Sequence, residues 1–468
     1  MTGPDLPAGT PDQRGASTPD RGIASTLPLS LHQAENLPPG FARATNVPII
    51  AARFGAGLQP ARLVRAFEAV AARHEALRLR LVPDGEQLRQ LIAESGPVVE
   101  EIALPGSPTD AELAAELEQV LGRRTELATD GPTVARLYRL GNGEFAALFA
   151  VTHVAADGWS VGVLARDIAQ LYLGAPLPDI EPGYYRRYVR EQHDLGTVLT
   201  DRQAEFFQSS MAGVPALPLR RPLPAQPAAA YRSLRRPLAP EDAAAVYQLA
   251  QRLRTTPAKL LMAAVFLAVK DYFGLGRDAA FAVLDVSAAR GREQVDWAGL
   301  LSKGVPVPVR TPDGLAVGEF VTGVHRHSLR ALSMLAGPYS LKRVLTLLHE
   351  GGQSPAGDAL YRRHWTAEAP AAHSLMFNCL TIARPSQAPF GAEVEYRPLY
   401  PAEPLAAEKN RISDLDVLPL IDGVSISLGI NAHPAVHDDG DVEHLLGAIQ
   451  GILIGWAHGW DPDRRLGG

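Results

Sequence analysis

Residues 145–172 read FAALFAVTHVAADGWSVGVLARDIAQLY, and this stretch decides how the fold is interpreted. It opens with an apolar run, residues 145–151, whose length predicts one buried strand. Four apolar residues then follow at helical spacing, Val161, Leu164, Ile168 and Leu171. His153 lies between the predicted strand and the predicted helix. We therefore expect the strand to hold the imidazole in place and the following turn to let the ring meet a substrate.

Composition limits the class of protein. A chain of 468 residues can bury a large core, and two domains or lobes are the expected organisation. Charged residues make up 21% and hydrophobic residues 46%, which is ordinary for a soluble globular protein. The net charge of −6, without any basic run, argues against a nucleic acid partner.

Cysteine usage and hydropathy indicate the compartment. Cys379 is the single cysteine of the chain, which excludes an intrachain disulfide framework and suits a reducing cytosol. No apolar run approaches the roughly 20 residues of a membrane-spanning helix, and the N-terminus lacks a secretory signal pattern. We therefore expect a cytoplasmic protein without a membrane partner.

Shifts in composition divide the chain. Residues 1–26 are rich in Pro, Gly, Thr, Ser and Asp and predict a disordered leader. Residues 27–212 alternate strand and helix patterns and form the predicted N-terminal lobe, which carries the His153 stretch. Residues 213–230 are dense in proline and alanine and predict an extended connection. Residues 231–468 form the predicted C-terminal lobe. Because both lobes mix strand and helix patterns, the predicted fold class is α/β with mixed sheets (α+β).

Proline and glycine shape the second half. Residues 305–309 predict a strand, which Pro306 and Pro308 limit to an edge or crossover position. Residues 351–371 are interpreted as a loop. The last predicted helix covers residues 442–456, with its apolar residues on one face.

The chemistry that the His153 turn favours is acid–base catalysis. A histidine titrates near pH 6.5 in its ordinary state, about where a general base for an amine or alcohol works. Asp157, four positions later, could orient the imidazole or could turn away to an arginine and fix the loop. Gly158 permits a positive φ and a close backbone approach. The N–H groups of a helix that starts there could stabilise negative charge on an acyl oxygen.

Other interpretations remain open at this point. A lone histidine near a buried strand is more often a hydrogen-bonded structural residue. Three pairs have spacings that could ligate a metal, but none has an evident third ligand: His153 with Asp157, His325 with His327, and His433 with His437. No glycine-rich motif of the Rossmann or P-loop type is present. The sequence therefore predicts no metal site.

Several motifs, in a recognisable order, extend from about Leu27 to Trp456. They are Ser30 and Gln33 (SxAQ), Arg73–Leu81 (RHExLRTxF), Leu127–Leu137, Thr152–Gly158 (HHxxxDG), Ala331-Leu332 with Pro338-Tyr339 (ALxHQDVPF), and Arg411, Asp414 and Leu415 (RxDLEL). In this order and spacing the chain resembles the condensation-domain superfamily of nonribosomal peptide synthetases.

The resemblance implies a fold and a site. It implies two lobes, each similar to chloramphenicol acetyltransferase, in a V-shaped pseudodimer with a central tunnel. His153 would act there as general base or stabilise the tetrahedral intermediate. Thr152, Asp157 and Gly158 would support it, and Arg290 would pair with Asp157. Candidates for the substrate channel are Trp159, Ser160, Ser302 and Ser374.

The resemblance also implies a reaction. An acyl or aminoacyl donor would arrive as a thioester on the phosphopantetheine arm of a carrier protein acting in trans. A small amine or alcohol would accept it, which gives an amide or an ester. No cofactor would be bound permanently, and the protein would work as a monomer. We expect a stand-alone condensation enzyme of natural-product biosynthesis, such as antibiotic biosynthesis.

Two departures from the family pattern keep a second hypothesis open. Thr152 replaces the first histidine of the HHxxxDG motif, and residues 299–310 read GLLSKGVPVPVR where the family has GxFVNTLPLR. These changes favour a catalytically silent module that docks a carrier protein or a tailoring enzyme. The intact His153, Asp157 and Arg290 favour the enzyme.

Overall fold

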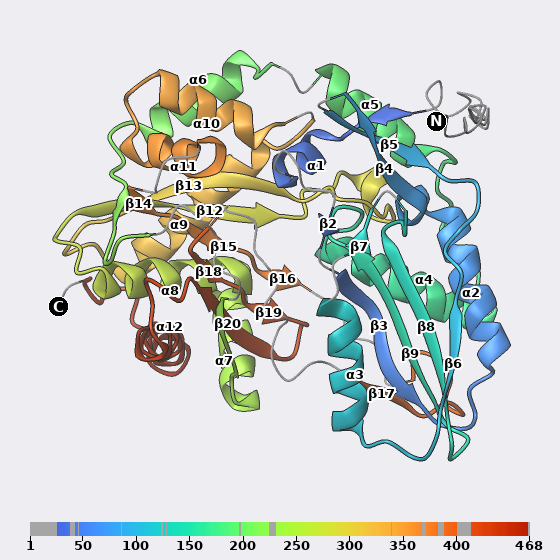
Figure 1. Cartoon of the computed structure of the whole chain (residues 1–468). Coiled ribbons are helices and arrows are strands. Elements are labelled where there is room, and N and C mark those ends of the chain that lie inside the picture. Colours follow the sequence, from blue (N-terminus) through green and yellow to red (C-terminus); the bar gives the residue numbers. More distant parts are fainter. Residues whose placement is uncertain are drawn as a thin grey trace, which may run out of the picture.

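The structure is a computed structural model, and it describes most of the chain (Figure 1). The described residues are 26–37, 43–44, 46–85, 87–122, 125–127, 129–195, 198–223, 231–337, 339–366, 371–381, 388–399 and 413–466. The predicted leader, except Thr26, lies outside them. So do residues 224–230 of the predicted connection, and Pro338 and Arg411 of the motifs.

A five-stranded sheet is the centre of the first lobe, with the strand order β17-β3-β9-β8-β6. The elements of this lobe up to its last helix are β1 (Leu27–Pro28), α1 (Leu31–Asn36), β2 (Arg43–Ala44), β3 (Asn46–Phe54), α2 (Pro60–Arg73), β4 (Leu79–Asp84), β5 (Gln87–Ile92), β6 (Glu100–Leu104), α3 (Asp110–Gly122), β7 (Thr125–Glu126), β8 (Thr133–Leu140), β9 (Phe145–Thr152), α4 (Gly158–Leu173) and α5 (Tyr184–Leu195). Helices α2 and α4 contact each other, and α3 contacts β3 and β9 (Figure 1).

Strand β9 is the buried strand that the sequence predicts. All eight of its residues are buried. Phe149 and Val151 pack in the core that contains α2 and α4, whereas Leu148 and Ala150 pack in the core that contains α3. The side chains alternate between the two faces of a central strand, so both faces are covered. This is why the run is continuously apolar.

A mixed sheet is the centre of the second lobe, with the order β13-β12-β15-β18-β20-β19-β16 and β11 paired to β20. The elements are α6 (Asp201–Met211), β10 (Leu217–Pro218), β11 (Arg232–Pro237), α7 (Pro240–Arg252), α8 (Pro257–Tyr272), β12 (Ala279–Ser287), β13 (Lys303–Thr311), α9 (Val317–Ser333), α10 (Leu341–Glu350), α11 (Pro355–Trp365), β14 (Ala372–His373), β15 (Leu375–Phe377), β16 (Leu380–Thr381), β18 (Leu415–Val417), β19 (Leu420–Ile421), β20 (Ile426–Ala432) and α12 (Asp439–Gly459). Strand β17 (Tyr396–Pro398) comes from this half of the chain but belongs to the sheet of the first lobe. Helices α7, α12, α8 and α9 pack successively against one another.

Two predictions about the second half have different outcomes. β13 is at one end of the sheet order, as the two prolines required, because an edge strand needs no N–H group on its outer side. The predicted loop at residues 351–371 is wrong, since it contains α11. Ser354 caps this helix by accepting a 3.0 Å hydrogen bond from the Gly357 amide, and Pro355 occupies its first turn.

The two lobes exchange segments. Phe207 and Met211 of α6 pack in the core of the second lobe, although the predicted N-terminal lobe extends to residue 212. In return, Trp297 and Leu301 from the segment between β12 and β13 pack in the core of the first lobe, and β17 pairs with β3. The two lobes therefore correspond only approximately to two consecutive parts of the chain.

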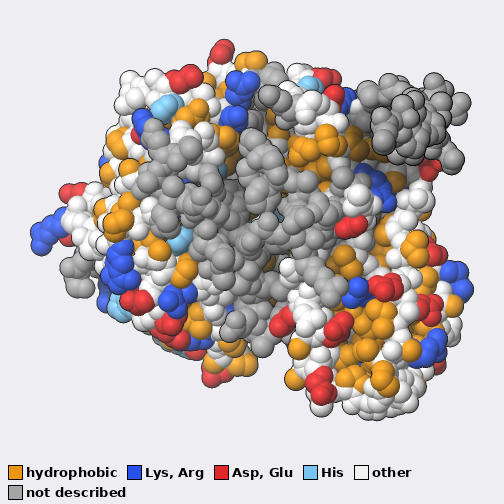
Figure 2. Space-filling view, viewed as in Figure 1, with side chains coloured by type: hydrophobic (Ala, Val, Ile, Leu, Met, Phe, Trp, Pro, Cys, Tyr) orange, Lys and Arg blue, Asp and Glu red, His pale blue; other side chains and the backbone are white. Residues whose placement is uncertain are grey.

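The predicted class, α/β with mixed sheets in two lobes, agrees with this architecture. On the face that Figure 2 shows, acidic and basic side chains are interspersed over both lobes without a dominant sign. Among the described residues, no helix combines the length and the apolar character needed to cross a bilayer.

Candidate active site

His153 directly follows β9 and is exposed. Its Nδ1 lies 3.0 Å from the carbonyl oxygen of Ala156. A carbonyl only accepts hydrogen bonds, so Nδ1 carries the proton and the neutral ring keeps its lone pair on Nε2. The turn thus fixes the tautomer that a general base requires.

The backbone of Thr152 shapes this turn. Its carbonyl accepts hydrogen bonds from the amides of Ala155 (2.9 Å) and Ala156 (3.3 Å), and its amide donates to Pro132 at 2.7 Å. The Thr152 side chain is fully buried, and among the described residues its Oγ1 has no hydrogen-bond partner. Thr152 therefore supports the turn through its main chain.

Asp157 is the N-cap of α4 and points away from the histidine. Its Oδ1 accepts hydrogen bonds from the Ser160 amide at 2.9 Å and from Arg290 Nη2 at 2.8 Å. Its Oδ2 accepts from Arg290 Nη1 at 3.0 Å. Of the two options that the sequence left open, the structure shows the pair with an arginine.

This ion pair joins the lobes, because Arg290 follows β12 and Asp157 precedes α4. Both side chains are buried, with 3% and 2% of their surface exposed. Burial pulls the pKa of Asp157 upward, but the Arg290 charge and the hydrogen bonds of Arg290 and Ser160 outweigh it, so the pKa is lowered. The carboxylate is therefore ionised, and its charge is matched by a bidentate partner.

The segment from 299 to 302 binds the same aspartate through its main chain. The amides of Leu301 and Ser302 donate to Asp157 Oδ2 at 3.0 and 2.8 Å, and the Asp157 amide donates to the Gly299 carbonyl at 3.2 Å. A side chain at Gly299 would meet Leu301 Cδ1 at 2.5 Å. The unusual sequence of this segment therefore still supplies contacts that depend on backbone atoms alone.

Aromatic residues anchor the segment further along. The Tyr184 hydroxyl donates to the Ala298 carbonyl at 3.0 Å and accepts from the Ala298 amide at 3.1 Å. The Tyr184 ring stacks on Trp297 with 4.9 Å between centroids. His74 of the RHExLR-like motif lies 2.8 Å from the same hydroxyl and 3.0 Å from Asp167. Sequence reasoning found the motif but not this contact with the second lobe.

Two further residues carry charge, one in the segment between β12 and β13 and one at the start of β13. Arg166 Nη1 donates to Asp296 at 2.6 Å. Lys303, the first residue of β13, donates through Nζ to the carbonyls of Leu335 (2.8 Å) and Gly337 (2.9 Å). Burial lowers the pKa of Lys303 to about 8, with a smaller opposing effect of Glu35. Its ammonium group binds the turn that follows α9.

Two properties were predicted for Gly158, a positive φ and a close backbone approach, and the structure uses one of them. It is the first residue of α4, and it is absent from the glycines with positive φ, so the expected left-handed backbone is not used. A Cβ at this position would lie 3.2 Å from Leu380 Cδ2 of the second lobe. The close approach between the lobes is thus the reason that glycine fits here.

The four channel candidates lie in different environments. Trp159 is 40% exposed, its Nε1 donates to the Val295 carbonyl at 2.8 Å, and Arg290 lies 5.8 Å from its ring centroid. Ser160 is fully buried, and its Oγ accepts from Arg290 Nη2 at 2.8 Å. Ser302 is half-buried beside Asp157. Ser374 is buried, and its amide donates to Asp414, so it belongs to another cluster.

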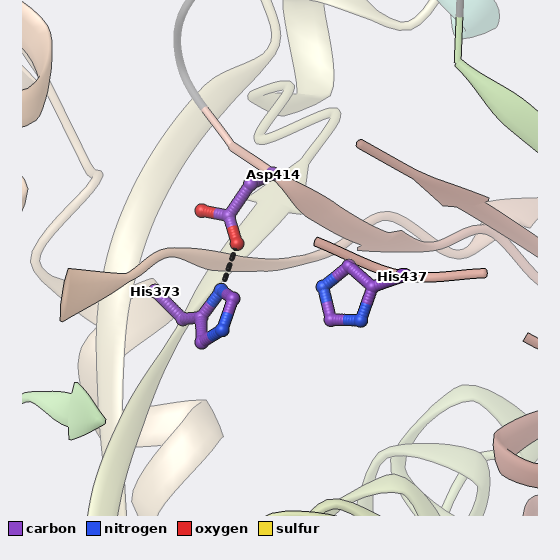
Figure 3. Close-up of side chains that lie close together, drawn as sticks. All are labelled: His373, Asp414 and His437. Carbon is purple, nitrogen blue, oxygen red and sulfur yellow. Dashed lines mark hydrogen bonds and ion pairs between the residues drawn. The ribbon is translucent and has the colours of Figure 1, made fainter. Parts of the chain in front are cut away.

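The metal pairs considered from spacing are not assembled as pairs. His325 Nδ1 lies 2.9 Å from Thr255 Oγ1, and His327 packs at 6.1 Å from the Phe206 ring. His437 instead lies with His373 and Asp414, the group among the described residues whose ligand atoms could hold a metal (Figure 3). Its members are separated by 23 to 64 positions, so spacing gave no signal.

Comparison with known proteins places the chain. The Condensation domain family matches residues 41–349. The probable non-canonical nonribosomal peptide synthetase CymA of Salinispora arenicola is 31% identical over 280 residues, which is 54% of this chain. The chain spans only 3% of the length of that synthetase.

Solved structures share the fold. SgcC5 of Streptomyces globisporus, solved with a naphthyl ethanediol and sucrose, has a TM-score of 0.74 at 19% identity, covering 94% of this chain and 100% of its own. The X-domain from teicoplanin biosynthesis, solved in complex with OxyB, has a TM-score of 0.68 at 20% identity, covering 98% and 97%. Because the family match extends over more than half of the residues, the chain belongs to the condensation-domain family.

Proposed function

We propose that this chain is a stand-alone acyltransferase that joins a carrier-bound acyl or aminoacyl group to an amine or an alcohol. The observation that carries the proposal is the state of His153. Its ring is exposed at a strand end, its Nδ1 is engaged by the Ala156 carbonyl, and its Nε2 is left to act as a base. The full-length match with SgcC5 supports a unit of this size.

The proposed reaction needs one base and no redox partner. Nε2 of His153 accepts a proton from the amine or hydroxyl group as its nitrogen or oxygen attacks the thioester carbonyl. The tetrahedral intermediate collapses with cleavage of the C–S bond, and the phosphopantetheine thiolate leaves and takes up the proton. In the alternative role, His153 holds the acceptor and stabilises that intermediate.

The inter-lobe ion pair would position this base. Asp157 Oδ1 caps α4 and both of its oxygens are bound by Arg290, so the turn that carries His153 is connected to the second lobe. We propose Asp157 and Arg290 as positioning residues. Thr152 and Gly158 would support them by main-chain bonding and by a close approach.

The proposed partners follow from the reaction. A carrier protein would deliver the donor on its phosphopantetheine arm, which is a substrate and not a resident cofactor. The bound diol in SgcC5 makes an alcohol acceptor worth testing beside amines. We propose a monomer in the cytoplasm, with Trp159 and Ser302 as channel residues.

A second function is favoured by one observation. The X-domain that shares this fold was solved in complex with OxyB, so a molecule of this shape can bind another protein. The hydroxyl of Thr152, where the motif has a histidine, is buried and has no partner in the part of the chain that the structure describes. This fits a module that docks a carrier or a tailoring enzyme without catalysis.

One genetic experiment separates the two functions. The gene is deleted in its host and replaced by the wild type, by His153→Ala, or by His193→Ala, which removes another exposed histidine. We expect the wild type and His193→Ala to restore an acylated metabolite, and His153→Ala to accumulate the two unjoined halves. Full restoration by a folded His153→Ala protein would overturn the enzyme and favour docking.

A further inference from the structure

A second cluster of ionisable side chains lies in the second lobe, outside the network of Asp157 and Arg290. His373 ends β14, Asp414 directly precedes β18, and His437 lies in the turn between β20 and α12. Their residues are 5%, 0% and 1% exposed. One ligand atom from each lies within 4.8 Å of the others, and Figure 3 shows the two rings and the carboxylate around a common space.

One atom of each residue faces this space, and two of these atoms already contact each other. Asp414 Oδ1 accepts from the Ser374 amide at 2.8 Å, while Oδ2 contacts His373 Nδ1. His437 Nδ1 lies 2.8 Å from the Tyr272 hydroxyl. His437 Nε2 is buried and has no hydrogen-bond partner among the described residues.

A buried ring nitrogen without a partner is costly, because it has lost water and gained nothing in return. Nearly every buried polar group in a folded protein is paired. In Figure 3 one edge of the His437 ring faces the pair formed by His373 and Asp414. His433 Nε2 is also buried without a partner among the described residues, so what distinguishes His437 is the imidazole and carboxylate that its Nε2 faces. These are the ligands that zinc prefers when no thiolate is available.

We propose that His373 Nδ1, Asp414 Oδ2 and His437 Nε2 bind one divalent transition metal ion, with Zn²⁺ as the ion that fits this donor set. Two of the outer contacts are those of a metal site, since the Tyr272 hydroxyl orients His437 and the Ser374 amide holds the other carboxylate oxygen. The third, the Arg220 amide at His373 Nε2, is a donor and must move when the ion binds. The ion would connect three segments of the second lobe. This site goes beyond the proposed acyl transfer and is independent of it.

Binding the ion requires small and specific movements. Zinc bonds of about 2.0–2.1 Å separate tetrahedral ligand atoms by about 3.3 Å. The present spread of up to 4.8 Å must shrink, and the close contact between His373 and Asp414 must open. The His373 proton must also move from Nδ1 to Nε2. There the new N–H group faces the Arg220 amide, so the hydrogen bond that this amide now donates to Nε2 at 3.2 Å is lost and the two donors must move apart.

The experiment uses the full chain as wild type, His437→Gln and His433→Gln. His433 is the matched control, because it is similarly buried at 2% and lies in the same turn but outside the ligand set. Each protein is dialysed in metal-free buffer, and its zinc content is measured by mass spectrometry. It is then titrated with Co²⁺, whose visible d–d absorption reports nitrogen and oxygen ligands.

We expect about one zinc ion per chain in the wild type and in His433→Gln, and at least about tenfold weaker binding in His437→Gln. In the zinc-loaded wild type, the Arg220 amide should lose protection against hydrogen exchange. If the wild type binds neither zinc nor Co²⁺, the proposal is overturned and a buried water molecule bridges the groups. Because the wild type decides this alone, a variant that fails to fold does not leave the proposal untested.

Discussion

Each lobe places a histidine between a strand of its central sheet and a helix that an aspartate caps. In the first lobe β9, His153 and Asp157 precede α4, and in the second lobe β20, His433 and Asp438 precede α12. The surroundings differ. His153 is exposed and Asp157 is buried against Arg290, whereas His433 is buried and Asp438 is exposed beside Arg221. Segments from elsewhere in the chain therefore give the same local structure different surroundings in the two lobes.

The largest effect on stability should come from breaking the buried ion pair between Asp157 and Arg290. Arg290→Leu leaves Asp157 ionised and buried without its partner, which should cost about 3–5 kcal/mol of unfolding free energy. Arg221→Leu removes the exposed partner of Asp438 and should leave the unfolding free energy almost unchanged. Urea denaturation of both variants measures the two values. Equal losses would show that an unpaired Asp157 carboxylate is no more costly at its buried site than an unpaired Asp438 at its exposed site.

Removing the Tyr184 hydroxyl, which binds the segment between β12 and β13, should give a smaller effect. Tyr184→Phe removes the hydroxyl that bonds to the amide and carbonyl of Ala298, and the loss should be about 1–3 kcal/mol because these groups remain buried. Tyr247→Phe is the control, since its hydroxyl binds backbone at an exposed site. Similar denaturation midpoints for the two variants would contradict this role of Tyr184.

The lowered pKa of Asp157 predicts how pH acts on the junction. The folded pKa lies below the unfolded one, so the contribution of this carboxylate is complete above the ordinary aspartate value of about 4 and is lost as the pH falls below it. Stability of the wild type should therefore fall more steeply in acid than that of Asp157→Asn. Parallel curves from denaturation at several pH values would rule this out.

The smallest effect concerns the residue before Arg290. Ala289 has a φ of 42°, a left-handed conformation that costs a residue with a Cβ about 1 kcal/mol. Ala289→Gly relieves this strain but makes the unfolded chain more flexible, so unfolding free energy should change by less than about 1 kcal/mol. The Ala289 methyl group packs at the edge of the core of the second lobe. A loss of several kcal/mol in the same assay would mean that these contacts outweigh the relief of strain.

Much of the fold was predictable because its signals are local. The continuous apolar run of β9 and the start of α4 at Gly158 depend on residues close together in the chain, and both were found. Helix α11 was missed because its glycine, serine and proline residues are typical of loops, while its stability comes from packing of Leu360 in the core of the second lobe. The exchange of segments between lobes has no local signal at all.

The sequence by itself determined the strand, the histidine, the helix and the family, since a few neighbouring residues and their order carry each of these. Only the tertiary structure showed the contacts between Asp157 and Arg290, which the family resemblance had implied, and only it brought His437 together with His373 and Asp414. The physical reason is that strand pairing sets which distant residues meet. A shift of one residue in the register of β18 on β20 would turn the side chains of β18 to the other face of the sheet.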